Sequence, residues 1–209
     1  MFGAVLSQAA QAALATLAKS AVVHDGYLAG GSALALRFGH RYSLDFDFFS
    51  EKHFDPHHMS DALSRLGSFQ EDFAKGISLI GTFNGIKMSY FQYPYPLLEK
   101  TDDFLGVGVA HHKDIAAMKI VAIGDRSTRK DYIDIYELVQ QGHTIDEIFS
   151  WYDAKYHKLE SNTFTILRSL TYFDEAEEEA MPEMLHPYTW DQIKQFFIKE
   201  SVRLAKTIL

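Results

Sequence analysis

The chain has 209 residues, 47% of them apolar and 23% charged, a composition that excludes a disordered chain and a fibre. Its 20 Lys and Arg residues are outnumbered by 28 Asp and Glu residues, and the formal charge of -8 disfavours non-specific binding of nucleic acid. The absence of cysteine excludes disulfides and cysteine-ligated metal, and no apolar run is long enough to span a membrane. We therefore expect a cytoplasmic globular protein without a membrane partner.

The N-terminal half mixes helical and strand-type patterns. In chain order it predicts a helix over residues 4–20, a strand over 27–29, a helix over 33–38, a strand over 44–49, a helix over 56–66, and strands over 77–83 and 86–93. Ser32 is the expected N-cap and Gly39 the expected C-cap of the second of these helices. Asn84-Gly85, between the last two strands, is the strongest hairpin signal in the chain.

From about Lys113 onward, only helical spacing of the apolar residues remains. It predicts a helix ending near Gly124, a helix from Tyr132 to near Gly142, and further helices over 145–156, 163–172 and 190–208. The expected architecture is therefore an α+β fold, in which an α/β unit of residues 1–110 precedes a helical unit of residues 111–209.

The strand over 27–29 ends at Gly30-Gly31-Ser32, which leads into a short helix. Backbone N–H groups of such a glycine-rich turn can approach an anion closely, and the helix N-terminus adds partial positive charge. A triphosphate would fit this turn. A plain strand–helix connection, with glycine for conformation and serine as a cap, is the alternative, and the turn alone leaves both interpretations open.

Asp45 and Asp47 lie two residues apart in the strand over 44–49, so their carboxylates should point to the same side while Phe46 and Phe48 face the core. Two neighbouring carboxylates repel each other unless a cation or a donor lies between them. Mg²⁺ suits the pair, because it binds one or two carboxylates together with substrate phosphates. An exposed edge strand is the alternative, although aspartate is a poor strand residue.

Four ordered motifs between residues 26 and 140 resemble those of the AbiEii-type toxin nucleotidyltransferases, a family with the polymerase-β-like nucleotidyltransferase fold. The motifs are Gly30-Gly31-Ser32-x-Leu34-x-x-Arg37, Ser43-Leu44-Asp45-Phe46-Asp47-Phe48-Phe49, Asp114-Ile115-Ala116-Ala117-Met118-Lys119 and Arg126-x-x-x-Lys130-Asp131-x-x-Asp134. The resemblance implies a mixed sheet with helices, followed by a helical region that completes the active site.

The resemblance also implies a role for each matched residue. Asp45 and Asp47 would hold two Mg²⁺ ions, Lys119 would contact phosphate, and Asp131 would act as general base or as a further metal ligand. The nucleotide-binding residues would be Gly30, Gly31, Ser32, Arg37, Arg126 and Lys130. The reaction would be in-line attack of an acceptor hydroxyl on the α-phosphate of a nucleoside triphosphate, with pyrophosphate as the leaving group.

The same resemblance implies a toxin–antitoxin pair, with tRNA 3′ ends as the acceptor and a DNA-binding antitoxin that is encoded nearby and need not contact the toxin. The basic run Arg126-Ser127-Thr128-Arg129-Lys130 suits an RNA acceptor, although a solvated basic loop explains it equally simply. The net acidity of the chain suits a small acceptor. The acceptor therefore stays open between RNA, a protein and a small molecule.

Two positions leave alternatives open. Ser89 stands where polymerase-β-type sites usually place a third carboxylate, so either Asp131 substitutes for that acid or metal binding is weakened. Weakened binding would suit a nucleotide-binding regulatory module without catalysis, and the same fold also serves drug or sugar nucleotidyltransferases. Arg37 is expected either to touch phosphate or to lie exposed on its helix.

Overall fold

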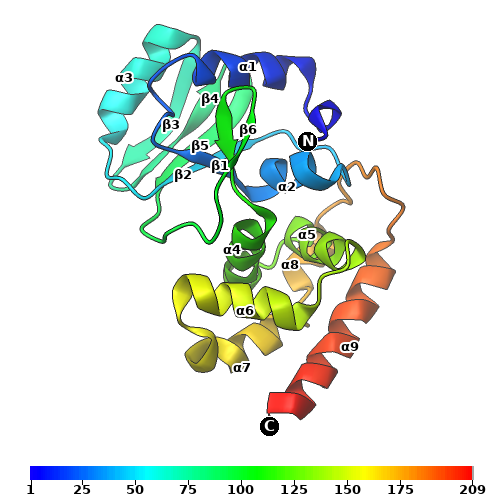
Figure 1. Ribbon diagram of the computed structural model, residues 1–209. Coiled ribbons are helices and arrows are strands. Elements are labelled where there is room, and N and C mark those ends of the chain that lie inside the picture. The colour runs from blue at the N-terminus through cyan, green and yellow to red at the C-terminus, as the bar shows by residue number, and fades with distance from the viewer. Residues whose placement is uncertain (209) are drawn as a thin grey trace. The chain divides into compact units, whose positions relative to one another are not determined.

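The computed structural model describes residues 1–208, which form two compact units with their boundary between His111 and His112 (Figure 1). The first unit is built around a β-sheet, and the second is made of helices. Each unit buries its own set of apolar side chains. The predicted α+β class is confirmed.

The first unit contains one seven-stranded mixed sheet, with the strand order β3-β4-β5-β2-β1-β7-β6. Its strands are β1 (Tyr27–Ala29), β2 (Phe46–Ser50), β3 (Phe69–Lys75), β4 (Ser78–Phe83), β5 (Ile86–Gln92), β6 (Asp102–Phe104) and β7 (Val107–Val109). The β2–β5 and β1–β7 pairs are parallel, and the remaining neighbours are antiparallel. β1 and β2 therefore lie side by side near the middle of the sheet.

Helices of the first unit pack on this sheet: α1 (Gln8–Ala18) contacts β5 and β7, α2 (Gly30–Phe38) contacts β1 and β2, and α3 (Pro56–Leu66) contacts β3 and β4. Within β2, Phe46 and Phe48 are buried, and Phe48 stacks on Tyr90 of β5 with ring centroids 6.2 Å apart. This burial confirms the alternation predicted for the strand. A shift of β2 by one residue in register would turn Asp47 into the core. The burial of Phe46 and Phe48 therefore keeps Asp47 on the opposite face of the strand.

The first unit departs from the sequence predictions in three places. The expected helix over 4–20 is divided into a 3₁₀ turn, Gly3–Val5, and α1. α2 begins at Gly30, so Ser32 is its third residue, and the N-cap is Ala29 instead. The sequence does not predict three of the strands, β3, β6 and β7. β3 is largely exposed along its length, and β6 and β7 have only three residues each.

Helices joined by loops make up the described part of the second unit. Its helices are α4 (His112–Asp125), α5 (Arg129–Gln140), α6 (Ile145–Tyr156), α7 (Leu159–Ser169), α8 (Asp174–Glu178) and α9 (Trp190–Ile208). The predictions for α6 and α9 are confirmed, and Thr144 starts α6 with a capping box closed by Glu147. α7 begins and ends earlier than the predicted helix over 163–172, and the short acidic α8 has no apolar period to predict it.

Tyr132 of α5 lies at the centre of the second core. Three aromatic rings surround it at centroid distances of 5.1 to 5.8 Å: Phe173, Trp190 and Phe197. Its hydroxyl donates to the carbonyl oxygen of Ser169 at 2.7 Å. Burial raises the pKa of Tyr132 to about 12, so this donor keeps its proton at neutral pH. The ring and its hydrogen bond thus hold α5 against the later helices.

Candidate active site

The first turn of α2 has the features of an anion-binding turn. β1 ends at Ala29, and α2 begins at once with Gly30, which adopts a positive φ of 66°. The N-cap residue is Ala29, whose methyl group cannot accept a hydrogen bond from the N–H groups of the first turn. These N–H groups carry the positive end of the helix dipole, so a phosphate oxygen would be a favourable partner for them.

Each glycine of this turn makes room for a different charged side chain. A Cβ on Gly30 would lie 2.5 Å from Oδ2 of Asp47, and a Cβ on Gly31 would collide with the guanidinium of Arg41. Gly31 does not have a positive φ, so the contact with Arg41 is what requires glycine there. A carboxylate and a guanidinium therefore both lie against the first turn of α2.

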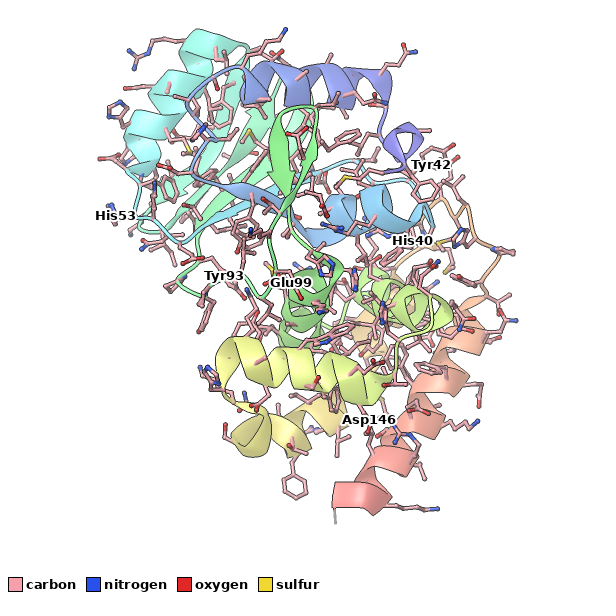
Figure 2. All side chains as sticks on the ribbon, in the orientation of Figure 1. His40, Tyr42, His53, Tyr93, Glu99 and Asp146 are labelled. Atoms are coloured by element: carbon pink, nitrogen blue, oxygen red, sulfur yellow. The ribbon has the colours of Figure 1, made fainter. Side chains whose placement is uncertain are left out.

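Arg41 is a site residue that sequence reasoning missed. It follows His40 and precedes Tyr42 on the segment that joins α2 to β2, and its large side chain is fully buried. Figure 2 labels these two neighbours. Its Nη1 donates to the carbonyl oxygen of Tyr42 at 3.2 Å. Because a guanidinium stays charged at neutral pH, it adds positive charge beside the turn. Its sequence signal is its position between the glycine turn and the paired acids.

Asp47 is held between two neighbouring strands. It pairs with Ala29 of β1 on one side and with Ser89 of β5 on the other. The hydroxyl of Ser89 donates to Oδ1 of Asp47 at 2.5 Å, whereas Oδ2 is the oxygen that faces Gly30. The serine thus orients the carboxylate, which presents its second oxygen to the first turn of α2.

Asp45 lies one residue before β2, and its side chain is exposed. Its backbone carbonyl accepts a hydrogen bond from the hydroxyl of Ser32, and this hydroxyl also hydrogen-bonds with that of Ser43 at 2.8 Å. Ser32 is buried, so its hydroxyl ties the first turn of α2 to the segment that carries Asp45. The position of Asp45 beside the turn is therefore fixed through its backbone, while the residue stays exposed to solvent.

Arg37 is engaged in the last turn of α2, away from Gly30. Its side chain is only 11% exposed, so the alternative of an exposed helix residue is wrong. Its guanidinium donates to the carbonyl oxygens of Ala110 at 2.6 Å and Val109 at 3.1 Å, and it pairs with Asp102 at 2.8 Å. These bonds fasten α2 to the end of β7 and to β6, and the contact with phosphate stays a prediction.

In the helical unit, Lys119 of α4 binds two aspartates of α5. Its Nζ lies 2.8 Å from Oδ1 of Asp131 and 2.7 Å from Oδ2 of Asp134. Both aspartates are fully buried, and Lys119 is 5% exposed. Residues three apart share one face of a helix, which lets both carboxylates reach the same ammonium group. The predicted catalytic residues Lys119 and Asp131 thus belong to one buried ion cluster.

Both carboxylate oxygens of Asp131 accept hydrogen bonds. Arg126 donates from Nε at 3.0 Å and from Nη2 at 3.2 Å, and the hydroxyl of Thr128 donates at 2.6 Å. Burial by itself would raise the pKa of Asp131, but Lys119 and Arg126 together lower this pKa to about 2. A carboxylate with so low a pKa is a weak proton acceptor at neutral pH.

The predicted basic run divides into buried and exposed cations. Arg129 is buried, lies over the ring of Trp190 at 4.8 Å and donates to the carbonyl oxygen of Ala176 at 2.8 Å. Lys130 is exposed, and the side chain of Arg126 is 62% exposed although it also binds the buried carboxylate. The run is therefore not a uniformly solvated loop, and Arg126 and Lys130 are its surface cations.

The acids of the first unit suit a hard divalent cation. Among the side chains that the structure describes, no group of three His, Asp or Glu residues could hold a metal ion by itself. Asp45 and Asp47 supply carboxylate oxygens, and Mg²⁺ is commonly bound by one or two carboxylates plus phosphate oxygens and water. Gly30 leaves space next to Oδ2 of Asp47. The donor set fits Mg²⁺ on the condition that phosphate supplies further ligands.

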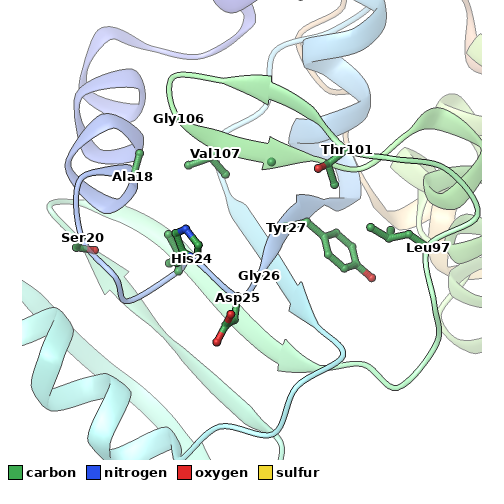
Figure 3. A pocket seen from close by; sticks show the side chains of 12 residues that line it. Ala18, Ser20, His24, Asp25, Gly26, Tyr27, Leu97, Thr101, Gly106 and Val107 are labelled. Carbon is green, nitrogen blue, oxygen red and sulfur yellow. The ribbon is translucent and has the colours of Figure 1, made fainter.

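A separate cavity of about 360 Å³ lies at the start of β1 (Figure 3). Tyr27 and Thr101 are among the residues that line it, whereas Gly30 follows the other end of the strand. Its acidic residue, Asp25, is exposed and paired with Lys52 at 2.6 Å. This cavity is therefore not where the glycine turn and the paired acids meet.

Comparison with known sequences relates the chain to one family. The sequence model described as "Nucleotidyl transferase AbiEii toxin, Type IV TA system" matches residues 12–97 and 77–202. The "Uncharacterized protein aq_aa25" of Aquifex aeolicus (strain VF5) is 40% identical over 191 residues, which cover 88% of this chain and 90% of the relative. Both matches include the glycine turn, the paired acids and the ion cluster of the helical unit.

Comparison with solved structures shows a shared fold. JHP933 from Helicobacter pylori superposes with a TM-score of 0.52 at 13% identity, covering 96% of this chain and 94% of that protein. MenT4, a nucleotidyltransferase toxin from Mycobacterium tuberculosis H37Rv, also gives a TM-score of 0.52 at 13% identity, covering 94% of this chain and 85% of that one. Within residues 1–208, helices are too short or too polar to cross a membrane.

Proposed function

Because the chain belongs to the AbiEii family of nucleotidyltransferase toxins, we propose that it transfers a nucleoside monophosphate from a nucleoside triphosphate to an acceptor hydroxyl in a Mg²⁺-dependent reaction. The observation that carries this proposal is the meeting of Asp47 with the first turn of α2, where Oδ2 lies against Gly30. An anion-binding turn and a cation-binding carboxylate at the same point are what a metal–triphosphate complex requires.

In this proposal the backbone of the turn binds the phosphates. The N–H groups at Gly30, Gly31 and Ser32 lie at the uncapped start of α2 and donate to phosphate oxygens. Arg41 adds a buried positive charge behind Gly31. The hydroxyl of Ser32 serves a different purpose, because it holds the segment that carries Asp45.

Asp45 and Asp47 would hold two Mg²⁺ ions, which neutralise charge on the triphosphate as the reaction proceeds. The acceptor oxygen attacks the α-phosphorus, the bond from this phosphorus to the bridging oxygen breaks, and pyrophosphate leaves. The hydroxyl proton passes to solvent or to a base other than Asp131, since the pKa of Asp131 is lowered to about 2.

We assign the residues of the helical unit different tasks. Lys119 contacts phosphate, as the family resemblance implies, and Asp131 and Asp134 orient its ammonium group. The surface cations Arg126 and Lys130 are assigned to an anionic part of the nucleotide or of the acceptor. Loss of the Lys119 charge should then raise KM for the triphosphate more than a neutral change at Lys130.

We further propose that the acceptor is an RNA end, namely a tRNA 3′ end, and that the chain acts in the cytoplasm with an antitoxin encoded nearby. Support comes from the type IV toxin–antitoxin family and from the exposed cations Arg126 and Lys130. The formal charge of -8 limits non-specific attraction to RNA, so recognition should depend on this local basic pair.

The decisive experiment incubates the full chain with Mg²⁺, radiolabelled nucleoside triphosphates tested one at a time, and total tRNA. We expect label on tRNA, and no label with Asp45→Asn or Asp47→Asn. Asp72→Asn serves as the matched control, because Asp72 is an exposed aspartate of the edge strand β3. If all three variants label RNA as well as the wild type does, the assignment of Asp45 and Asp47 to catalysis is wrong.

Two other outcomes would redirect the proposal. Pyrophosphate release only after addition of an aminoglycoside or a sugar phosphate would identify a small-molecule nucleotidyltransferase. Tight triphosphate binding without pyrophosphate release under any acceptor would identify a nucleotide-binding regulatory module, the alternative that Ser89 in place of a third acid favours.

A further inference from the structure

Ser89 makes a directed contact with the carboxylate of the proposed site. It lies in β5, where its register partners are Asp47 of β2 and Ile80 of β4, and it is 8% exposed. Its hydroxyl donates to Oδ1 of Asp47 at 2.5 Å, within the range of about 2.5–2.7 Å for a hydroxyl bound to a carboxylate. The serine proton is thus committed to one oxygen of Asp47, and the carboxylate is held in one orientation.

The carboxylate of Asp47 has few acidic neighbours that could share a metal ion with it. Asp45 and Asp47 contribute two negative charges, and no other acidic or histidine side chain in the described chain joins them in a group of three. The buried guanidinium of Arg41 lies against Gly31, the next residue of the same turn. A divalent ion alone would therefore meet few anionic ligands, whereas a triphosphate brings further oxygens for the ion.

We propose that Ser89 is a positioning residue that aims Asp47 at the turn, and that its presence instead of an acid makes divalent-ion binding depend on the triphosphate. The ion then binds together with the nucleotide and not before it. This inference rests on the proposed function, because it concerns the same ion and the same triphosphate.

Equilibrium dialysis with Mn²⁺ tests the inference without measuring transfer. The full chain is placed on one side of the membrane, with or without the α,β-methylene analogues of ATP, GTP, CTP and UTP, and the excess Mn²⁺ on the protein side is measured at physiological ionic strength. We expect excess Mn²⁺ with at least one analogue, and none below about 1 mM Mn²⁺ in its absence. Excess Mn²⁺ at low concentration without any analogue would overturn the inference.

Three substitutions of Ser89 separate its contributions. Ser89→Ala should weaken Mn²⁺ binding in the presence of the analogue by about 10- to 100-fold, the usual effect of losing a group that orients a metal ligand. Ser89→Thr keeps the hydroxyl in a residue that suits strands, and it should restore binding. Ser89→Asp adds a third carboxylate and should allow Mn²⁺ to bind without the analogue.

Ser50→Ala is the matched control. Ser50 is also a buried serine of this sheet, but its hydroxyl donates to the carbonyl oxygen of Asp25 at 2.9 Å. The control should lose some thermal stability and keep wild-type Mn²⁺ binding. If Ser89→Ala binds Mn²⁺ and analogue as the wild type does, the positioning role is wrong, while the proposed function stands. If the wild type binds no Mn²⁺ and no analogue when the two are supplied together, the proposed function fails. This inference then fails with it.

Discussion

Each unit of the chain contains a pair of aspartates, and the two pairs are in opposite physical states. Asp45 is exposed and Asp47 half-buried, and neither forms an ion pair with a side chain that the structure describes. Asp131 and Asp134 are fully buried and share the ammonium group of Lys119. The spacing of acids along a strand or helix therefore does not decide what they do. Burial and a cation within the chain decide whether a pair can bind an added ion.

The strongest test of this contrast removes the shared cation. Lys119→Met should lower the free energy of unfolding by about 3–5 kcal/mol, because it removes the ammonium group that two buried carboxylates share. Urea unfolding followed by circular dichroism measures the change. Lys130→Met is the matched control, since Lys130 is exposed, and it should change stability by less than about 0.5 kcal/mol. Equal stability of both variants would show that the cluster is not structurally important.

The acids of the sheet should behave in the reverse way. Asp47→Asn should reduce pyrophosphate release by more than about 100-fold, because losing a direct ligand costs more than losing a group behind it. Its thermal stability should stay near that of the wild type, since asparagine keeps the shape and can still accept from Ser89. Asp134→Asn should instead lower stability. Full activity of Asp47→Asn would show that this carboxylate is not needed for catalysis.

The pH dependence of stability tests the buried Asp131 by itself. The pKa of Asp131 is lowered from 3.8 to about 2, so this carboxylate stabilises the folded chain above pH 3.8 and loses its contribution as the pH falls through 2. The contribution is about 2 kcal/mol. Urea unfolding between pH 5 and pH 2.5 should therefore show a smaller decline for Asp131→Asn than for the wild type. A parallel decline in both would contradict the lowered pKa.

Local chemistry accounts for the parts of the fold that the sequence predicts. Asp55 caps α3 by accepting the N–H groups of His57 and His58, and Asn84-Gly85 joins β4 to β5 with positive φ at both residues. Such signals need only neighbouring residues. β3 escapes prediction because, as an edge strand exposed along most of its length, it has no apolar alternation.

In the candidate site, too, the sequence predicts the contiguous motifs but not the contacts between residues far apart in the chain. The glycine turn and the acids at 45 and 47 are visible as motifs, because each motif is contiguous. The contact between Ser89 and Asp47 joins residues 42 positions apart and depends on the parallel register of β2 and β5. The burial of Arg41 against Gly31 depends on the path of the segment between α2 and β2. Register and chain path are tertiary properties, so the sequence indicates the acids without indicating what orients them.

The smallest effects compare two glycines that both lie in helices. Gly30→Ala should lower the free energy of unfolding by about 1–2 kcal/mol, because alanine is strained at a φ of 66°. Its methyl group would also press on Oδ2 of Asp47, so binding of a triphosphate analogue should weaken.

Gly124→Ala is the matched control in α4, where the φ is not positive and a Cβ would meet no atom within 4 Å. Alanine should raise stability there by about 0.5–1 kcal/mol, since it restricts the unfolded chain and suits a helix. Thermal melting and dialysis of a labelled analogue measure both variants. If Gly30→Ala had no more effect than Gly124→Ala, the turn could accommodate a methyl group beside Asp47. The close approach of this carboxylate to the start of α2 would then not be required at the site.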